Sequence, residues 1–273
     1  MTDHKHSPAK DEASAPPASP FMSMFETFRS ELDEHHDRRE RIIKASRDIT
    51  ALSKKMIFSL QRVRTLSTPL PPSVTKENNS RQSQITDLFK SIVPDLQVIN
   101  AWRYQRQISP SIQEYIEAIS FQHYLSNQTL ITFTEAQHQL PPGISLTEDD
   151  YLLGLFDLVG ELMRFAITSM ATHGTLPRGP KPSKQDDGGQ EEGNDILTDL
   201  RSLRSGFEGL DTTSSGKDWT PLKRDVGKKM EVMRSCVEKV EGAMYGMIVR
   251  GRERPKGWVP DLGGGEGREV ESY

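Results

Sequence analysis

Two predicted helical segments, residues 111–125 and 150–164, each carry a pair of carboxylates inside a largely apolar run. The pairs are Glu114 with Glu117, and Asp157 with Glu161. Spacings of three and four residues place both members of a pair on one face of an α-helix. Burial of an unpaired carboxylate is costly, so such groups need a cation, a proton or several hydrogen bonds. If the two helices face each other, the four carboxylates form the ligand set of a hard divalent ion.

Asp157 is the strongest of these four signals. It lies between Phe156 and Leu158, and further apolar residues crowd the same helix: Leu152, Leu153, Leu155, Val159, Leu162 and Met163. We therefore expect Asp157 to be buried and functional. The alternative is that Glu114 and Glu117 lie on a solvated face and that Asp157 is paired with an arginine. The spacing alone does not decide between the two.

The composition excludes several classes of protein. The longest apolar runs of the 273-residue chain are far shorter than the roughly 20 residues of a membrane span. The first residues lack the apolar segment of a secretory signal, so we expect an intracellular setting. Cys236 is the single cysteine, which excludes a disulfide framework and argues against a thiolate zinc site. With a net charge of −4, any nucleic-acid binding has to come from a local basic patch.

Apolar residues recur at spacings of three and four along most of the chain, without a strand or repeat signal. We predict an all-α fold, with a single domain of about seven helices over residues 21–255. Residues 1–20 and 256–273 are predicted to be disordered tails, residues 173–194 a mobile loop and residues 73–80 a polar linker. The predicted helices cover residues 22–66, 81–106 (where Pro94 offers a bend), 109–125, 147–172 and 196–207, and a last helix ends at Arg250. That helix carries an apolar seam that needs a partner helix: Met230, Met233, Val237, Val240, Met244 and Met247.

Arginines and histidines are the remaining candidates for a site. Arg103 and Arg106 precede Glu114 and Glu117 by eleven residues each, close to three helical turns. On a continuous helix both arginines could hold phosphates while the acids hold an ion; a solvated basic face is the alternative. Three histidines have spacings that do not suit a shared metal site, and we interpret them as ordinary polar residues: His35, His36 and His123.

Short motifs between about residue 25 and residue 260 resemble one known family. They include Ser46-Arg-Asp-Ile-Thr50, Gln113-Glu-Tyr-Ile-Glu-Ala118, Ser120-Phe-Gln-His123, Asp150-Tyr-Leu-Leu-Gly154, Gly160-Glu-Leu-Met-Arg164 and Val249-Arg-Gly251. Together they resemble the translin family, in the branch of translin-associated factor X. Translin itself lacks the acidic pair of the Gln-Glu-Tyr-x-Glu segment and the aspartate at position 157.

The resemblance implies a seven-helix fold that assembles with translin into a hollow hetero-octamer, in the cytoplasm and nucleus. It implies binding of single-stranded RNA, with single-stranded DNA as a further ligand. It also implies a Mg²⁺-dependent endoribonuclease, with Mn²⁺ as a substitute ion, that acts in RNA interference and tRNA processing. Glu114, Glu117 and Asp157 match the catalytic acids, and with Glu161 they match the metal-side acids. A non-catalytic nucleic-acid-binding subunit and a helical scaffold that docks through the C-terminal seam remain as alternatives.

Overall fold

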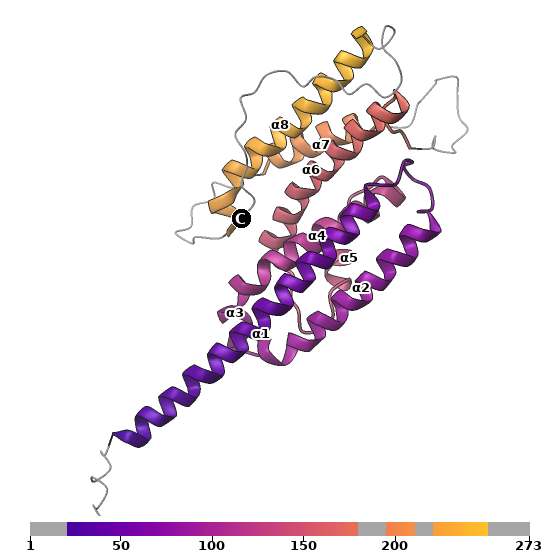
Figure 1. Cartoon of the computed structure of the whole chain (residues 1–273). Helices are drawn as coiled ribbons and strands as arrows, with labels where there is room; N and C mark the ends of the chain where they lie inside the picture. The colour runs from indigo at the N-terminus through magenta and orange to yellow at the C-terminus, as the bar shows by residue number, and fades with distance from the viewer. Residues whose placement is uncertain (1–20, 180–194, 211–220, 251–273) are drawn as a thin grey trace, which may run out of the picture. The chain divides into compact units, whose positions relative to one another are not determined.

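The computed structural model describes residues 21–179, 195–210 and 221–250 (Figure 1). Within these ranges the chain forms eight α-helices, one 3-10 helix and no strand: α1 (Met22–Leu60), α2 (Pro72–Ile92), η1 (Val93–Leu96), α3 (Ile99–Arg103), α4 (Gln105–Asn127), α5 (Phe133–His138), α6 (Glu148–His173), α7 (Ile196–Glu208) and α8 (Pro221–Arg250). The all-α prediction is confirmed. The predicted tails and most of the predicted loop at 173–194 lie outside the described residues.

The chain divides into two compact units, Met1–Glu40 and Arg41–Tyr273. The described part of the first unit is the N-terminal half of α1. Its large apolar side chains are exposed by 45–69%: Phe21, Met22, Met24, Phe25, Phe28 and Leu32. The second unit contains the buried core. Among the described helices, none combines the length and the hydropathy of a membrane span.

The core of the second unit forms where α6 packs between two other helices. α4 lies along α6, and α8 lies along α6 and α7 (Figure 1). Phe121 of α4 meets Phe165 of α6 edge to face, with ring centroids 6.2 Å apart. As predicted, α6 starts after Thr147, whose side chain accepts a hydrogen bond from the backbone N–H of Asp150. It ends at His173, and Gly174, the next residue, adopts the left-handed conformation that favours glycine (φ 69°).

The apolar seam of α8 finds its partner helices within the same chain. Met233, Val237 and Val240 are buried, and the other seam residues are partly buried against the core. The contacts run to α6 and α7. This packing leaves little of the seam to dock another protein.

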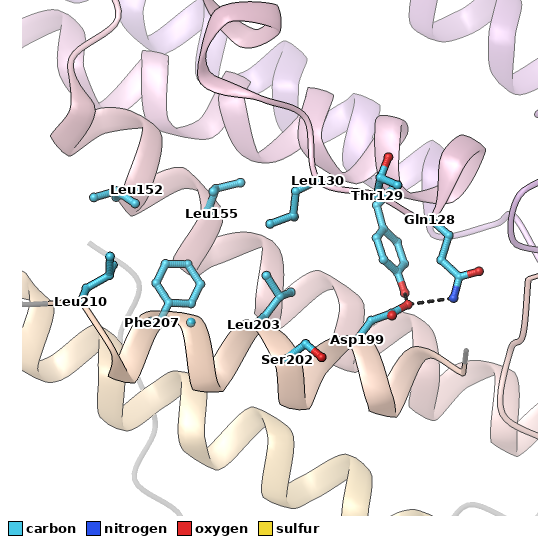
Figure 2. A pocket seen from close by; sticks show the side chains of 12 residues that line it. Gln128, Thr129, Leu130, Leu152, Leu155, Asp199, Ser202, Leu203, Phe207 and Leu210 are labelled. Atoms are coloured by element: carbon cyan, nitrogen blue, oxygen red, sulfur yellow. Dashed lines mark hydrogen bonds between the residues drawn. The ribbon is translucent and has the colours of Figure 1, made fainter. Parts of the chain in front are cut away.

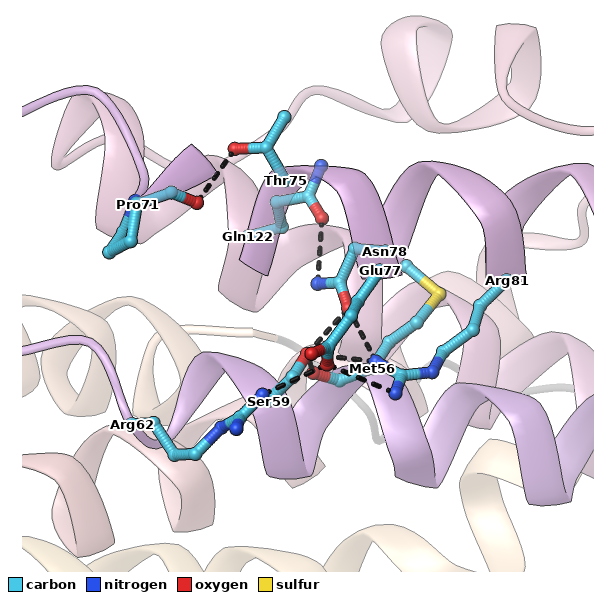
Figure 3. Close-up of polar contacts among 9 residues, drawn as sticks. All are labelled: Met56, Ser59, Arg62, Pro71, Thr75, Glu77, Asn78, Arg81 and Gln122. Carbon is cyan, nitrogen blue, oxygen red and sulfur yellow. Dashed lines mark hydrogen bonds and ion pairs between the residues drawn. The ribbon is translucent and has the colours of Figure 1, made fainter. Parts of the chain in front are cut away.

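A buried polar network joins α1, α2 and α4 (Figure 3). Asn78 of α2 is 1% exposed, accepts a hydrogen bond from the Ser59 hydroxyl at 2.5 Å and donates to Gln122 Oε1 at 3.2 Å. Residues 73–80, which were predicted to form a linker, belong to α2 and are helical. That prediction was wrong. Pro72 suits a first helical position, and the polar Asn78 can be buried because its hydrogen bonds are satisfied.

Two further boundaries differ from the prediction. The first helix ends at Leu60 rather than near residue 66. Residues 81–106 are not one helix, because Pro94 lies in the 3-10 turn after α2 and Val98 adopts a positive φ of 55°. Proline lacks the N–H that a continuing helix requires, so the chain turns there.

α4 continues through Pro110, where a helix start was predicted. A proline inside a helix removes one backbone hydrogen bond and is normally destabilising. Asp150, at the start of α6 and 1% exposed, fixes α4 at this point. Its carboxylate accepts hydrogen bonds from the Ser109 hydroxyl and from Gln113 Nε2, the latter at 2.8 Å. A side chain distant in sequence thus stabilises a helix that local rules would end.

Gly154 sets the separation of α4 and α6. A Cβ atom at this position would lie 2.9 Å from the backbone oxygen of Gln113 and 2.9 Å from Cγ2 of Ile116. The carbonyl oxygen belongs to the backbone of α4 and cannot rotate away. Only glycine therefore allows the two helices to approach as closely as they do.

We expect Gly154→Ala to lower the free energy of unfolding by about 1–3 kcal/mol, because the helices must separate. Denaturant titration of the purified chain measures this change. Gly160→Ala on the same helix is the matched control, since an added Cβ there meets nothing within 4 Å. That control should be neutral or stabilising by up to about 1 kcal/mol. Equal effects of the two substitutions would contradict the close-contact interpretation.

Candidate functional site

One cavity of about 670 Å³ is lined by all four predicted carboxylates. Glu114 and Glu117 reach it from α4, and Asp157 and Glu161 reach it from α6. The other lining residues come from α1, the turn after it, and α6: Lys54, Ile57, Phe58, Gln61 and Arg164. The close packing of α4 on α6 therefore brings the two predicted pairs together.

Asp157 is bound by a cation from α8. Lys229 Nζ donates hydrogen bonds to both carboxylate oxygens of Asp157. The Asp157 side chain is 37% exposed, so it is less buried than its apolar neighbours led us to expect. An ionic partner was one of the two expectations for this residue, but the partner is a lysine rather than an arginine.

Glu161 and Glu114 also have polar partners. Arg164 Nη1 donates to the two oxygens of Glu161 at 2.8 and 3.0 Å, and Gln61 Nε2 donates to Glu161 Oε2 at 2.7 Å. Lys54 Nζ lies 3.8 Å from Glu114 Oε2. Burial raises the pKa of the Glu114 carboxyl, whereas the Lys54 ammonium lowers it.

Glu117 is the carboxyl group that burial affects most. It is 9% exposed, and no described residue forms a hydrogen bond or ion pair with it. Desolvation, followed by the negative charges of Glu114, Asp157 and Glu161, raises the pKa of Glu117 to about 9, and Lys229 opposes this shift. At neutral pH the Glu117 carboxyl therefore holds a proton, while the other three carboxylates face cations.

The donor chemistry of this cavity fits a hard divalent cation. Mg²⁺ prefers carboxylate oxygens and keeps several of its waters, and a nearby cation favours the ionised form of a buried carboxyl such as Glu117. The side chains do not form a ready ligand set: in the described part of the chain, no three His, Cys, Asp or Glu residues are grouped to hold one ion. Binding of an ion therefore requires side chains such as Lys229 to rearrange.

The predicted basic residues lie away from this cavity. Neither Arg103, at the end of α3, nor Arg106, in the first turn of α4, is among its lining residues, and both are exposed. Arg106 and Glu117 belong to one continuous helix, which keeps them on nearly the same face, roughly 16 Å apart. Contact of these arginines with nucleic acid stays a prediction. His123 also lies outside the lining, with Nε2 3.0 Å from the Thr129 hydroxyl.

Sequence reasoning missed Lys54, Gln61 and Lys229 as residues of the site. Gln61 follows α1 and holds Glu161 through its side chain, but an isolated glutamine at a helix end carries no chemical signal. Lys229 is 72 residues from Asp157 in sequence. Its only signal was its position beside Met230, at the edge of the apolar seam of α8.

A second cavity, of about 480 Å³, lies among α4, α6 and α7 (Figure 2). Leucines and Phe207 form most of its wall. At its polar end, Asp199 accepts hydrogen bonds from the Tyr124 hydroxyl at 2.7 Å and from Gln128 Nε2 at 2.8 Å. Asp199 is the only carboxylate among the lining residues, and none of them is a lysine, arginine or histidine. The carboxylate cavity is therefore the candidate for chemistry.

The sequence matches the model of the Translin family over residues 37–251, a range that contains all four carboxylates. The chain belongs to the translin family. Translin-associated protein X of Rattus norvegicus is 30% identical over 281 residues, which cover 94% of this chain and 88% of the relative. The Translin-associated protein X homolog of Schizosaccharomyces pombe is 31% identical over 229 residues, covering 83% and 87%. The predicted resemblance to the translin-associated factor X branch is confirmed.

Two solved structures share this all-α fold. The crystal structure of apo-NeC3PO aligns with a TM-score of 0.57 and 17% identity, covering 87% of this chain and 99% of that chain. The crystal structure of AfC3PO aligns with a TM-score of 0.54 and 19% identity, covering 85% and 100%. At these identities the likeness concerns the fold alone.

We expect Glu117→Gln to stabilise the metal-free protein in a pH-dependent way. As the pH rises from about 4.5 towards 9, the unfolded chain releases the Glu117 proton while the folded chain retains it, so wild-type stability falls. The penalty at pH 7 is on the order of 3 kcal/mol. The glutamine has no such proton, so the variant should unfold at a higher temperature than wild type at pH 8, with a smaller difference at pH 5. Thermal unfolding in chelator measures this, and a difference that does not change with pH would contradict the assignment.

Proposed function

We propose that this chain is the catalytic subunit of a Mg²⁺-dependent endoribonuclease that it forms with translin, and that the complex cleaves single-stranded RNA. The observation that carries the proposal is the single cavity into which α4 and α6 each place two carboxylates. The relatives named Translin-associated protein X support translin as the partner. The exposed apolar side chains of residues 21–32 offer a surface for assembly into a hetero-octamer.

Glu114, Glu117 and Asp157 would hold the ion, with Glu161 beside them. A divalent ion lowers the pKa of water and stabilises charge on phosphoryl oxygens, which is the chemistry that hydrolysis of a phosphodiester needs. Glu117 would take part as a carboxylate, its proton passing to solvent when the ion binds. Gln61 would orient the Glu161 carboxylate through the hydrogen bond described above.

Two exposed cations at this cavity suit the phosphates of a strand. The side chains of Lys54 and Arg164 are 65% and 62% exposed, so each can turn to a phosphate with little loss. A further hollow of about 420 Å³ continues along the same face of α1, shares Lys54 and includes Arg47 and Gln107. A protein with a net negative charge needs such a local basic patch to bind nucleic acid.

Water is the nucleophile that this site favours. Attack by the RNA 2′-hydroxyl typically uses an acid and a base that titrate near neutrality, most often histidines. The described lining of the cavity contains carboxylates but no histidine. Attack by water leaves the 2′-hydroxyl intact, and the products then carry a 3′-hydroxyl and a 5′-phosphate.

A second candidate function is a non-catalytic RNA-binding subunit. It is favoured by the ion pairs of Asp157, Glu161 and Glu114, because acids with purely structural roles are also expected to have cationic partners. The two functions differ in what removal of one charge does. Loss of a structural charge should change stability, whereas loss of a catalytic charge should stop cleavage by a folded protein.

We expect Glu117→Gln in the complex with translin to slow cleavage of single-stranded RNA by at least about 100-fold, because the amide keeps the shape but loses the charge that holds the ion. In chelator, where neither protein holds an ion, binding of the same RNA should change little. Gel analysis of cleavage and fluorescence anisotropy measure the two quantities.

Glu238→Gln is the matched control, because Glu238 is exposed on α8 and lies outside the cavity lining. It should cleave at the wild-type rate. Cleavage by Glu117→Gln at that same rate would overturn the catalytic proposal and favour the RNA-binding one. Mass spectrometry of the wild-type products checks the nucleophile, and a 2′,3′-cyclic phosphate end would contradict attack by water.

A further inference from the structure

Lys229 is placed differently from the other cations of the site. It belongs to α8, whereas the carboxylates belong to α4 and α6. Its side chain is 28% exposed, compared with 65% for Lys54 and 62% for Arg164. Its ammonium group donates to both oxygens of Asp157. Of the three cations, it is therefore the least solvated, and it engages the whole of one carboxylate.

This position conflicts with binding of a divalent ion by Asp157. An ion that shares the Asp157 carboxylate with the Lys229 ammonium would place like charges within a few ångströms, in a partly buried cavity where screening is weak. Arg164 and Lys54 can relieve the same conflict by turning into solvent, since both are more than half exposed. Lys229 has the least access to solvent, so its charge needs another anion once it leaves Asp157.

We propose that Lys229 exchanges partners: it holds Asp157 while the cavity contains no divalent ion, and it moves to a phosphate of the RNA strand when an ion takes its place. This inference rests on the proposed function. The lysine is a positioning residue for Asp157 in the first state and a phosphate ligand in the second. Its flexible four-carbon stem lets the ammonium move without displacement of α8.

The exchange couples the binding of metal and RNA. An ion that displaces Lys229 creates an unpaired ammonium at the site, and a phosphate that binds this ammonium makes the displacement more favourable. Coupling between two ligands is reciprocal, so RNA must raise the affinity for the ion by the same factor as the ion raises the affinity for RNA. The factor should fall towards one when the lysine charge is removed.

The test uses the full chain in complex with translin and compares Lys229→Met with wild type. Methionine keeps most of the apolar stem and removes the charge. Electron paramagnetic resonance measures Mn²⁺ binding without RNA. Lys229→Met should bind Mn²⁺ about tenfold more tightly than wild type, because the competing cation is gone. With Mn²⁺ bound, a phosphorothioate RNA strand that resists cleavage should bind Lys229→Met more weakly, with a slope of log affinity against log salt that is shallower by about one.

Two control variants separate charge from position. Lys228→Met removes an exposed lysine next in sequence and should leave both affinities unchanged. Lys229→Arg retains the charge and should not bind Mn²⁺ more tightly than wild type; this holds even if the methionine variant folds poorly. Tighter Mn²⁺ binding by Lys229→Arg would overturn the exchange.

The outcomes distinguish this inference from the proposed function. If wild type binds Mn²⁺ and Lys229→Met binds it equally or more weakly, the exchange is wrong and the metal-dependent function stands. If Glu117→Gln leaves the Mn²⁺ affinity of both proteins unchanged, neither binds the ion at this cavity. The proposed function then fails, and the exchange fails with it. Tighter Mn²⁺ binding by Lys229→Met than by wild type, without the same gain in Lys229→Arg, would support the exchange most strongly.

Discussion

The close contact of α4 with α6 at Gly154 is the constraint on which the site depends. Because an added Cβ would meet a backbone oxygen at 2.9 Å, the two helices can lie this close only with glycine at that position. The contact brings two carboxylate pairs to one cavity and removes Glu117 from water. The same packing that stabilises the core therefore creates the electrostatic cost that a bound cation can relieve.

The site balances its own charges before any ligand arrives. Lys229 holds Asp157, Arg164 holds Glu161, and Glu117 retains a proton because its pKa is raised to about 9. The ion pairs stabilise the fold without a bound ion, whereas the protonated Glu117 lowers its stability at neutral pH. Binding of an ion then requires a proton and side chains to move. The long-range contacts of α8 thus belong to the chemistry of the site as well as to its packing.

The helix periodicity and carboxylate spacing predicted the all-α fold and the grouping of Glu114, Glu117, Asp157 and Glu161. What the sequence could not show were interactions between residues far apart in it. Asn78 looked like part of a linker because its buried partners lie on other helices. Ser109-Pro110 looked like a helix start because Asp150, which fixes the helix there, is about forty residues away. Lys229 was missed for the same reason, since no local pattern links it to Asp157.

The central claim is that the acids of α4 and α6 hold a divalent ion. Anomalous diffraction from crystals of the complex with translin, grown with Mn²⁺, tests it most directly. The account predicts an anomalous peak among Glu114, Glu117 and Asp157, with carboxylate oxygens at about 2 Å from it. Saturating Mn²⁺ with no peak in this cavity would contradict the claim.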